Sequence, residues 1–96
     1  MKRITYISRL AQSLQPEDLG TLGEAARSHN AQSGITGVLL CSGGFFFQII
    51  EGDEAEIDRL YRKILADPRH REVVCLKTDR DIPWRQFPNW SMEVIK

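Results

Sequence analysis

The side chain with the clearest chemical demand is Gln48, a primary amide inside the most hydrophobic stretch of the chain, residues 45–50. An amide buried in an apolar strand without a hydrogen-bond partner costs about 1–3 kcal/mol, so a partner is expected in the protein or in a ligand. Alternation along a strand places Gln48 on one face with Phe46 and Ile50. Whatever touches that face should contact the amide.

Tyr6 and Asn30 are the polar side chains expected nearest to Gln48. Tyr6 lies in a predicted first strand, and Asn30 lies at the end of a predicted first helix. If Ile4 and Tyr6 face the helices, as Gln48 does, the phenol lies beside the amide; a shift of one residue would turn Gln48 outward. A phenol and two amides would then form a polar pocket in an apolar wall.

Each candidate also has an ordinary structural interpretation. Tyr6 alone would be a half-buried strand tyrosine, and Asn30 would be a helix-terminating residue in the left-handed conformation. The other candidates would be solvated, capping or core side chains: His29, Lys63, His70, Trp90 and Met92.

Five strands and two helices are predicted to position these residues, in the order βαββαββ. The predicted strands span residues 2–8, 35–41, 45–50, 72–78 and 90–95. Ser42-Gly43-Gly44 predicts a hairpin turn between the second and third strands.

The helix boundaries follow from their capping residues. Pro16 opens a first helix that ends near Asn30, with an apolar stripe at Leu19, Leu22 and Ala26. Asp53 with Glu56 predicts a capping box for the second helix, which Asp67-Pro68 ends. Its predicted apolar stripe consists of Ile57, Leu60, Tyr61, Ile64 and Leu65.

This order of elements predicts an α+β fold, a ferredoxin-like sandwich. Right-handed βαβ crossovers place both helices on one face of a mostly antiparallel five-stranded sheet. The chain has 96 residues, which fits one domain over residues 1–96.

Composition excludes several classes of partner and site. The 13 basic and 13 acidic side chains give a net charge of +0, so neither nucleic acid nor a membrane surface is an expected partner. Cys41 and Cys75 lie in apolar segments without metal-ligand spacing, which favours buried reduced thiols. With no signal peptide and no apolar run of about 20 residues, a cytoplasmic location is expected.

Three motifs, in order along the chain, resemble those of the BLUF domains, the blue-light sensors using flavin. The motifs are Ile4-Thr5-Tyr6-Ile7-Ser8, His29-Asn30 followed by Gly34-Ile35-Thr36-Gly37-Val38-Leu39, and Phe47-Gln48-Ile49-Ile50-Glu51-Gly52. The similarity extends through Asp67-Pro68-Arg69-His70 to Trp90-Ser91-Met92. Among BLUF domains, the chain is most similar to the sensor module of photoactivated adenylyl cyclases.

The resemblance implies a noncovalently bound flavin, FAD with FMN as the alternative, and a photosensory module that is not itself an enzyme. It implies that Tyr6 donates an electron and a proton to the excited flavin and that Gln48 then adopts a new hydrogen-bonding arrangement. Trp90 and Met92 would pass this change outward. The implied cofactor-binding residues are Tyr6, Leu22, His29, Asn30, Gln48, Lys63, Ile64, Asp67 and His70.

Two other functions fit the same fold. An RNA-recognition motif would place aromatic residues on the first and third strands, but Cys41-Ser42-Gly43-Gly44 lacks the expected cation. An acylphosphatase-like hydrolase would need a glycine-rich anion loop, which Ser8-Arg9-Leu10-Ala11 does not provide.

The second face of the sheet predicts a partner. Phe45, Phe47 and Ile49 face away from the helices and form a row that is too apolar to be left in water. We expect a second copy of the chain, or a carboxyl-terminal effector segment, to cover this row. The chain is therefore interpreted as an excised sensor module.

Overall fold

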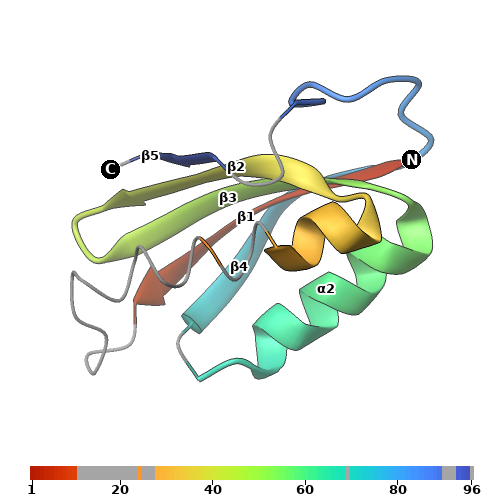
Figure 1. Cartoon of the computed structure of the whole chain (residues 1–96). Coiled ribbons are helices and arrows are strands. Elements are labelled where there is room, and N and C mark those ends of the chain that lie inside the picture. Colours follow the sequence, from red (N-terminus) through yellow and green to blue (C-terminus); the bar gives the residue numbers. More distant parts are fainter. Residues whose placement is uncertain (11–23, 25–27, 69, 90–92, 96) are drawn as a thin grey trace.

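The computed structural model describes residues 1–10, 24, 28–68, 70–89 and 93–95, and its elements form one sheet with helices on one face (Figure 1). Residues 24 and 28–33 are helical. The other elements are β1 (Lys2–Leu10), β2 (Thr36–Ser42), β3 (Phe45–Gly52), α2 (Glu54–Ala66), β4 (His70–Asp79) and β5 (Glu93–Ile95). The predicted ferredoxin-like α+β fold is confirmed.

The strand order in the sheet is β4-β1-β3-β2-β5. The β1·β3, β1·β4 and β2·β3 pairs are antiparallel, and β5 pairs with β2 in parallel. Gly43 and Gly44 have φ values of 57° and 82°, which the predicted two-residue hairpin turn requires. The central strands β1 and β3 therefore carry Tyr6 and Gln48.

The first helix ends one turn later than predicted. Residues 28–33 are helical, and Gly34, with φ 68°, takes the left-handed conformation that was considered for Asn30. The Ile35 N–H donates to the Asn30 carbonyl at 2.9 Å, which is the longer bond of a Schellman motif. The predicted start at Pro16 and the stripe at Leu19, Leu22 and Ala26 lie outside the described residues.

Strand boundaries also differ from the prediction, and β3 continues past the predicted end at residue 50 to Gly52. β1 continues to Leu10, and β4 spans His70–Asp79 because it pairs along nearly the whole length of β1. β2 is shifted by one residue, to Thr36–Ser42. Of the predicted fifth strand, Glu93–Ile95 is a strand, and residues 90–92 lie outside the described residues.

Helix α2 packs through a narrower stripe than predicted. Ile57 and Ile64 are buried, but Leu65 is 53% exposed. Leu65 is the eighth residue after Ile57, which places it about 80° around the helix and off the packed face. Asp53 is the N-cap residue but makes no side-chain capping bond, so the predicted capping box with Glu56 is wrong.

The predicted inward face of the sheet is confirmed. Ile4, Tyr6, Phe46, Gln48 and Ile50 are all buried. The core cluster consists of Ile4, Tyr6, Ile35, Leu39, Cys41, Phe46, Ile50, Ile57 and Ile64. Both polar candidates of the central strands therefore lie within the hydrophobic core.

The structure also tests the predictions about the cysteines and about membrane-spanning helices. No disulfide links Cys41 and Cys75; Cys41 is buried as expected, but Cys75 is exposed on the edge strand β4. No helix in the described part of the chain is long and apolar enough to cross a bilayer.

Candidate functional site

The centre of the site is a hydrogen bond between the two middle strands. Tyr6 of β1 and Gln48 of β3 are directly opposed in the antiparallel register. The Tyr6 hydroxyl donates to Oε1 of Gln48 within the core. The predicted neighbours are therefore in contact, and the Gln48 amide has a protein partner for its oxygen.

The surroundings keep Tyr6 protonated. Its ring meets the rings of Tyr61 and His70 edge-on, with centroids 5.8 and 6.2 Å away. Burial raises the pKa of the Tyr6 phenol well above its ordinary value, and the charges of Tyr61 and Asp67 raise it further. The phenol therefore keeps its proton at pH values well above its ordinary pKa.

Asn30 is the second buried amide of the site. It lies in the last turn of the first helix and is 1% exposed. That helix covers the same face of the sheet as α2 (Figure 1). The Asn30 carbonyl accepts the hydrogen bond of the Schellman motif that ends the helix, so the end of the helix fixes this residue in place.

His70 connects the start of β4 to the same face. Its Nδ1 shares a hydrogen bond of 2.8 Å with Ser8 Oγ, and its ring lies 5.1 Å from that of Phe46. Ser8 is 1% exposed and was not among the predicted site residues. Its position two residues after Tyr6, on the same strand face, could have indicated it.

The remaining predicted residues differ in their placement. Ile64 is buried in the core, His29 is half-buried and Lys63 is exposed. Asp67 is the half-buried C-cap residue of α2, and its carbonyl accepts the His70 N–H at 3.1 Å. Leu22, Trp90 and Met92 lie outside the described residues.

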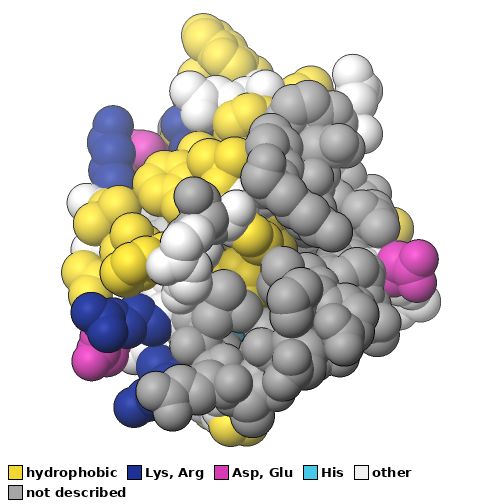
Figure 2. Space-filling view, turned by 90° about the vertical axis from the view of Figure 1, so that its left-hand side faces the viewer, with side chains coloured by type: hydrophobic (Ala, Val, Ile, Leu, Met, Phe, Trp, Pro, Cys, Tyr) yellow, Lys and Arg dark blue, Asp and Glu magenta, His cyan; other side chains and the backbone are white. Residues whose placement is uncertain are grey.

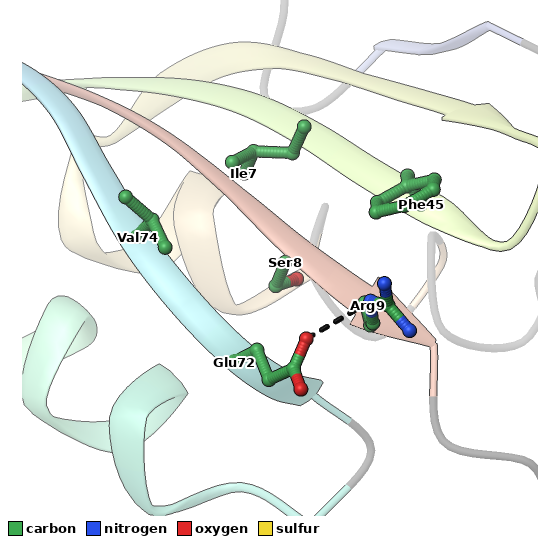
Figure 3. A pocket seen from close by; sticks show the side chains of 6 residues that line it. All are labelled: Ile7, Ser8, Arg9, Phe45, Glu72 and Val74. Atoms are coloured by element: carbon green, nitrogen blue, oxygen red, sulfur yellow. Dashed lines mark ion pairs between the residues drawn. The ribbon is translucent and has the colours of Figure 1, made fainter.

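A separate hollow of about 220 Å³ lies at the far end of β1 (Figure 3). It is lined by Ile7, Ser8, Arg9, Phe45, Glu72 and Val74. An ion pair of 2.9 Å between Arg9 and Glu72 crosses it, and the Arg9 guanidinium lies 5.4 Å from the Phe45 ring centre. These residues come mainly from the sheet face opposite Tyr6 and Gln48, so the hollow is distinct from that pair.

The outer sheet face carries apolar side chains, as predicted. Phe47 and Ile49 are half-buried and Phe45 is exposed. Val74 and Leu76 of β4 are also exposed, by 52% and 53%. Seen from the end of the molecule, hydrophobic side chains reach the surface beside Lys and Arg side chains (Figure 2).

Comparison with known proteins assigns the chain to a family. The family model "Sensors of blue-light using FAD", BLUF, matches residues 1–93. The beta subunit of photoactivated adenylate cyclase from Euglena gracilis is 33% identical over 95 residues, which are 97% of this chain and 11% of that subunit. The chain belongs to the BLUF family and is a blue-light sensor domain that uses a flavin.

Solved structures give the same assignment. A bacterial light-regulated adenylyl cyclase superposes with a TM-score of 0.95 at 47% identity, covering 98% of this chain and 27% of that one. Klebsiella pneumoniae BlrP1, solved with FMN and cyclic diGMP, gives a TM-score of 0.89 at 38% identity, covering 98% and 25%. The chain thus spans about a tenth to a quarter of the length of these relatives.

Proposed function

We propose that the hydrogen bond between Tyr6 and Gln48 is the photoactive switch of this sensor. The observation that carries the proposal is their direct contact inside the core. A bound flavin supplies the blue-light absorption and the electron acceptor. Tyr6 gives up an electron and its hydroxyl proton and regains both, so nothing is consumed.

Gln48 stores the result of this cycle. Its amide has two donor hydrogens and one acceptor oxygen, and that oxygen accepts from the Tyr6 hydroxyl. When the phenol loses its proton, this bond loses its donor, and rotation or tautomerisation of the amide presents a different set of groups. The side chain can change partners without movement of the β3 backbone, and Trp90 and Met92 are the proposed route outward.

The chemistry of the buried residues fits a flavin. An isoalloxazine ring is a flat apolar body with a polar edge, and the site combines two buried amides and a phenol with aliphatic core residues. The proposed cofactor-binding residues are Tyr6, Leu22, His29, Asn30, Gln48, Lys63, Ile64, Asp67 and His70. Asn30 and Gln48 would bind the polar edge, and Lys63, Asp67 and His70 the ribityl chain and phosphate.

FAD is the proposed flavin, with FMN as the alternative. The family description names FAD, whereas BlrP1 was solved with FMN. Chromatography of the cofactor released from purified protein distinguishes the two, because only FAD carries an adenosine group.

The chain is proposed to act as one domain, residues 1–96, that signals to a partner and has no enzymatic activity of its own. The cyclase relatives are several times longer than this chain. A carboxyl-terminal effector domain, or a second copy of the chain, would cover the apolar outer face. The proposed compartment is the cytoplasm, as expected from the sequence.

The test of the switch is the change Gln48→Leu. This variant should still bind flavin but lose the small light-induced red shift of the visible absorption band. Gln32→Leu is the matched control, since Gln32 is exposed on the first helix. A normal shift in the Gln48→Leu protein would exclude the proposed mechanism.

A further inference from the structure

The connection between β4 and β5 must cross the whole sheet. These strands lie at opposite edges, four strand spacings apart, which is roughly 19 Å. Residues 80–89 run over the face opposite the helices (Figure 1). This path brings them to Glu51, near the end of β3.

Glu51 is a fully buried carboxylate that binds this connection. Its Oε2 accepts from Arg3 Nε at 3.0 Å and from the Gln86 N–H at 3.1 Å, and its Oε1 accepts from the Phe87 N–H at 2.5 Å. Burial of a carboxylate is costly unless each oxygen has donors, and here both oxygens have them. The two backbone bonds fix residues 86 and 87 on the sheet.

A second contact holds the same segment. Arg85 Nη1 donates to Thr36 Oγ1 at 2.9 Å and to the Glu51 carbonyl at 3.2 Å. Thr36 is the first residue of β2, the strand that pairs with β5. The connection is therefore anchored to both β3 and β2 before it reaches β5.

The position of β5 matters for the site. Leu39 of β2 is paired with Gln48 on one side and with Val94 of β5 on the other. A single row across the sheet thus joins Tyr6, Gln48, Leu39 and Val94. The described part of β5 contributes three paired residues, and so short a ladder is a weak determinant of its position.

We propose that Glu51 is a positioning residue whose buried carboxylate fixes the crossing segment and so holds β5 beside β2, in the row of Gln48. The part of this inference that concerns light rests on the proposed function of the Tyr6–Gln48 pair. The part that concerns the position of β5 does not depend on light.

The test is the change Glu51→Gln, compared with Glu72→Gln. Both glutamates bind an arginine Nε through Oε2, at 3.0 and 2.9 Å. Side-chain exposure is 14% and 0% for the Arg3–Glu51 pair but 59% and 67% for the Arg9–Glu72 pair. The same chemical change is thus made in a buried ion pair and in an exposed ion pair.

Amide hydrogen exchange in the dark is the first readout. In the Glu51→Gln protein one acceptor oxygen becomes an NH₂ group, so exchange at residues 86, 87 and 93–95 should be faster by about tenfold or more. Exchange at Tyr6 and Gln48 should change little, as should all exchange in Glu72→Gln. Unchanged exchange at 93–95, or equal acceleration in both variants, would overturn the inference.

The light response is the second readout. A purely structural role of Glu51 would not separate the flavin band shift from the light-induced change in exchange. Wild type and Glu72→Gln should show a light-induced change in exchange at 93–95, whereas Glu51→Gln should keep the flavin band shift but lose that change. If that change persists in Glu51→Gln, the coupling role is wrong. If wild type shows no band shift, the proposed function fails, while dark exchange still decides the role of Glu51.

A second variant covers the case in which Glu51→Gln does not fold. Arg85→Ala removes the bonds to Thr36 and the Glu51 carbonyl but leaves the buried carboxylate paired with Arg3. It should accelerate exchange at 86, 87 and 93–95 by a smaller factor. Wild-type exchange at 93–95 in this variant would overturn the inference.

Discussion

Gly37 of β2 should be the most sensitive glycine of the sheet, although its backbone conformation is ordinary. A Cβ at this position would overlap the Ile49 carbonyl oxygen, and it would lie 3.1 Å from that carbonyl carbon and 3.2 Å from the Ile50 Cα. All three atoms belong to the backbone of the central strand β3. The change Gly37→Ala therefore cannot be absorbed by rotation of a side chain, and β2 must move away from the strand that carries Gln48.

The expected cost of Gly37→Ala is about 3 kcal/mol or more, the upper range for overpacked core substitutions. A domain of this size is stable by about 5–14 kcal/mol, so a large fraction of its stability would be lost. Gly43→Ala is the control, because Gly43 has φ 57° and open space around its Cβ. Its cost should be about 1–2 kcal/mol, from the left-handed conformation alone.

Urea unfolding followed by circular dichroism measures both changes. With a denaturant slope of about 1–3 kcal/mol/M, Gly37→Ala should lower the midpoint by about 1–3 M and Gly43→Ala by clearly less. A Gly37→Ala protein as stable as the Gly43→Ala protein would refute the close approach of β2 and β3 described above.

Two further predictions concern the core. Ile57→Ala should cost about 2–5 kcal/mol, whereas Leu65→Ala on the exposed side of α2 should cost under about 1 kcal/mol; equal urea midpoints would contradict the packing of this helix. Because burial raises the pKa of Tyr6, the folded chain keeps this proton above the ordinary pKa near 10 while the unfolded chain releases it. Stability should therefore fall above pH 10, by up to about 1.4 kcal/mol per pH unit for this phenol, and tyrosinate absorbance appearing near pH 10 from Tyr6 in the native protein would contradict it.

The sequence was sufficient to predict the central pair of the site. Strand alternation assigned Tyr6 and Gln48 to the inward face, and an antiparallel arrangement of two central strands placed them opposite each other. Both steps depend on local periodicity and on a chain order that allows few topologies. The fold followed from the same reasoning, whereas the sequence left open whether the partner of the Gln48 amide was protein or ligand.

Features that depend on tertiary contacts were not predicted. Cys75 is exposed because β4 is an edge strand, and its register against β1 shifts between Thr5 and Tyr6 and again between Ile7 and Arg9, which interrupts the simple alternation. The sequence around Glu51 did not indicate that its carboxylate is buried, because its hydrogen-bond donors belong to residues 3, 86 and 87, far away in the sequence. Long-range partners of this kind are not encoded in local pattern.

The helix end was missed for a different reason. Asn30 and Gly34 can both adopt the left-handed conformation that ends a helix, and glycine does so without a steric cost. Gly34 takes that position, so the helix continues past Asn30 and the asparagine stays in its last turn. This outcome keeps Asn30, which is buried, within the helix and on the side of the sheet that carries Tyr6 and Gln48.

The most direct test of the switch is the light-minus-dark absorption spectrum of the Tyr6→Phe protein beside that of Tyr61→Phe. Tyr61 is the matched control because its ring packs against Tyr6 but does not bond to Gln48 in the described site. We expect both variants to bind flavin, with a reversible red shift after blue light in Tyr61→Phe and none in Tyr6→Phe. A full, reversible shift in Tyr6→Phe would contradict the role of the Tyr6–Gln48 hydrogen bond.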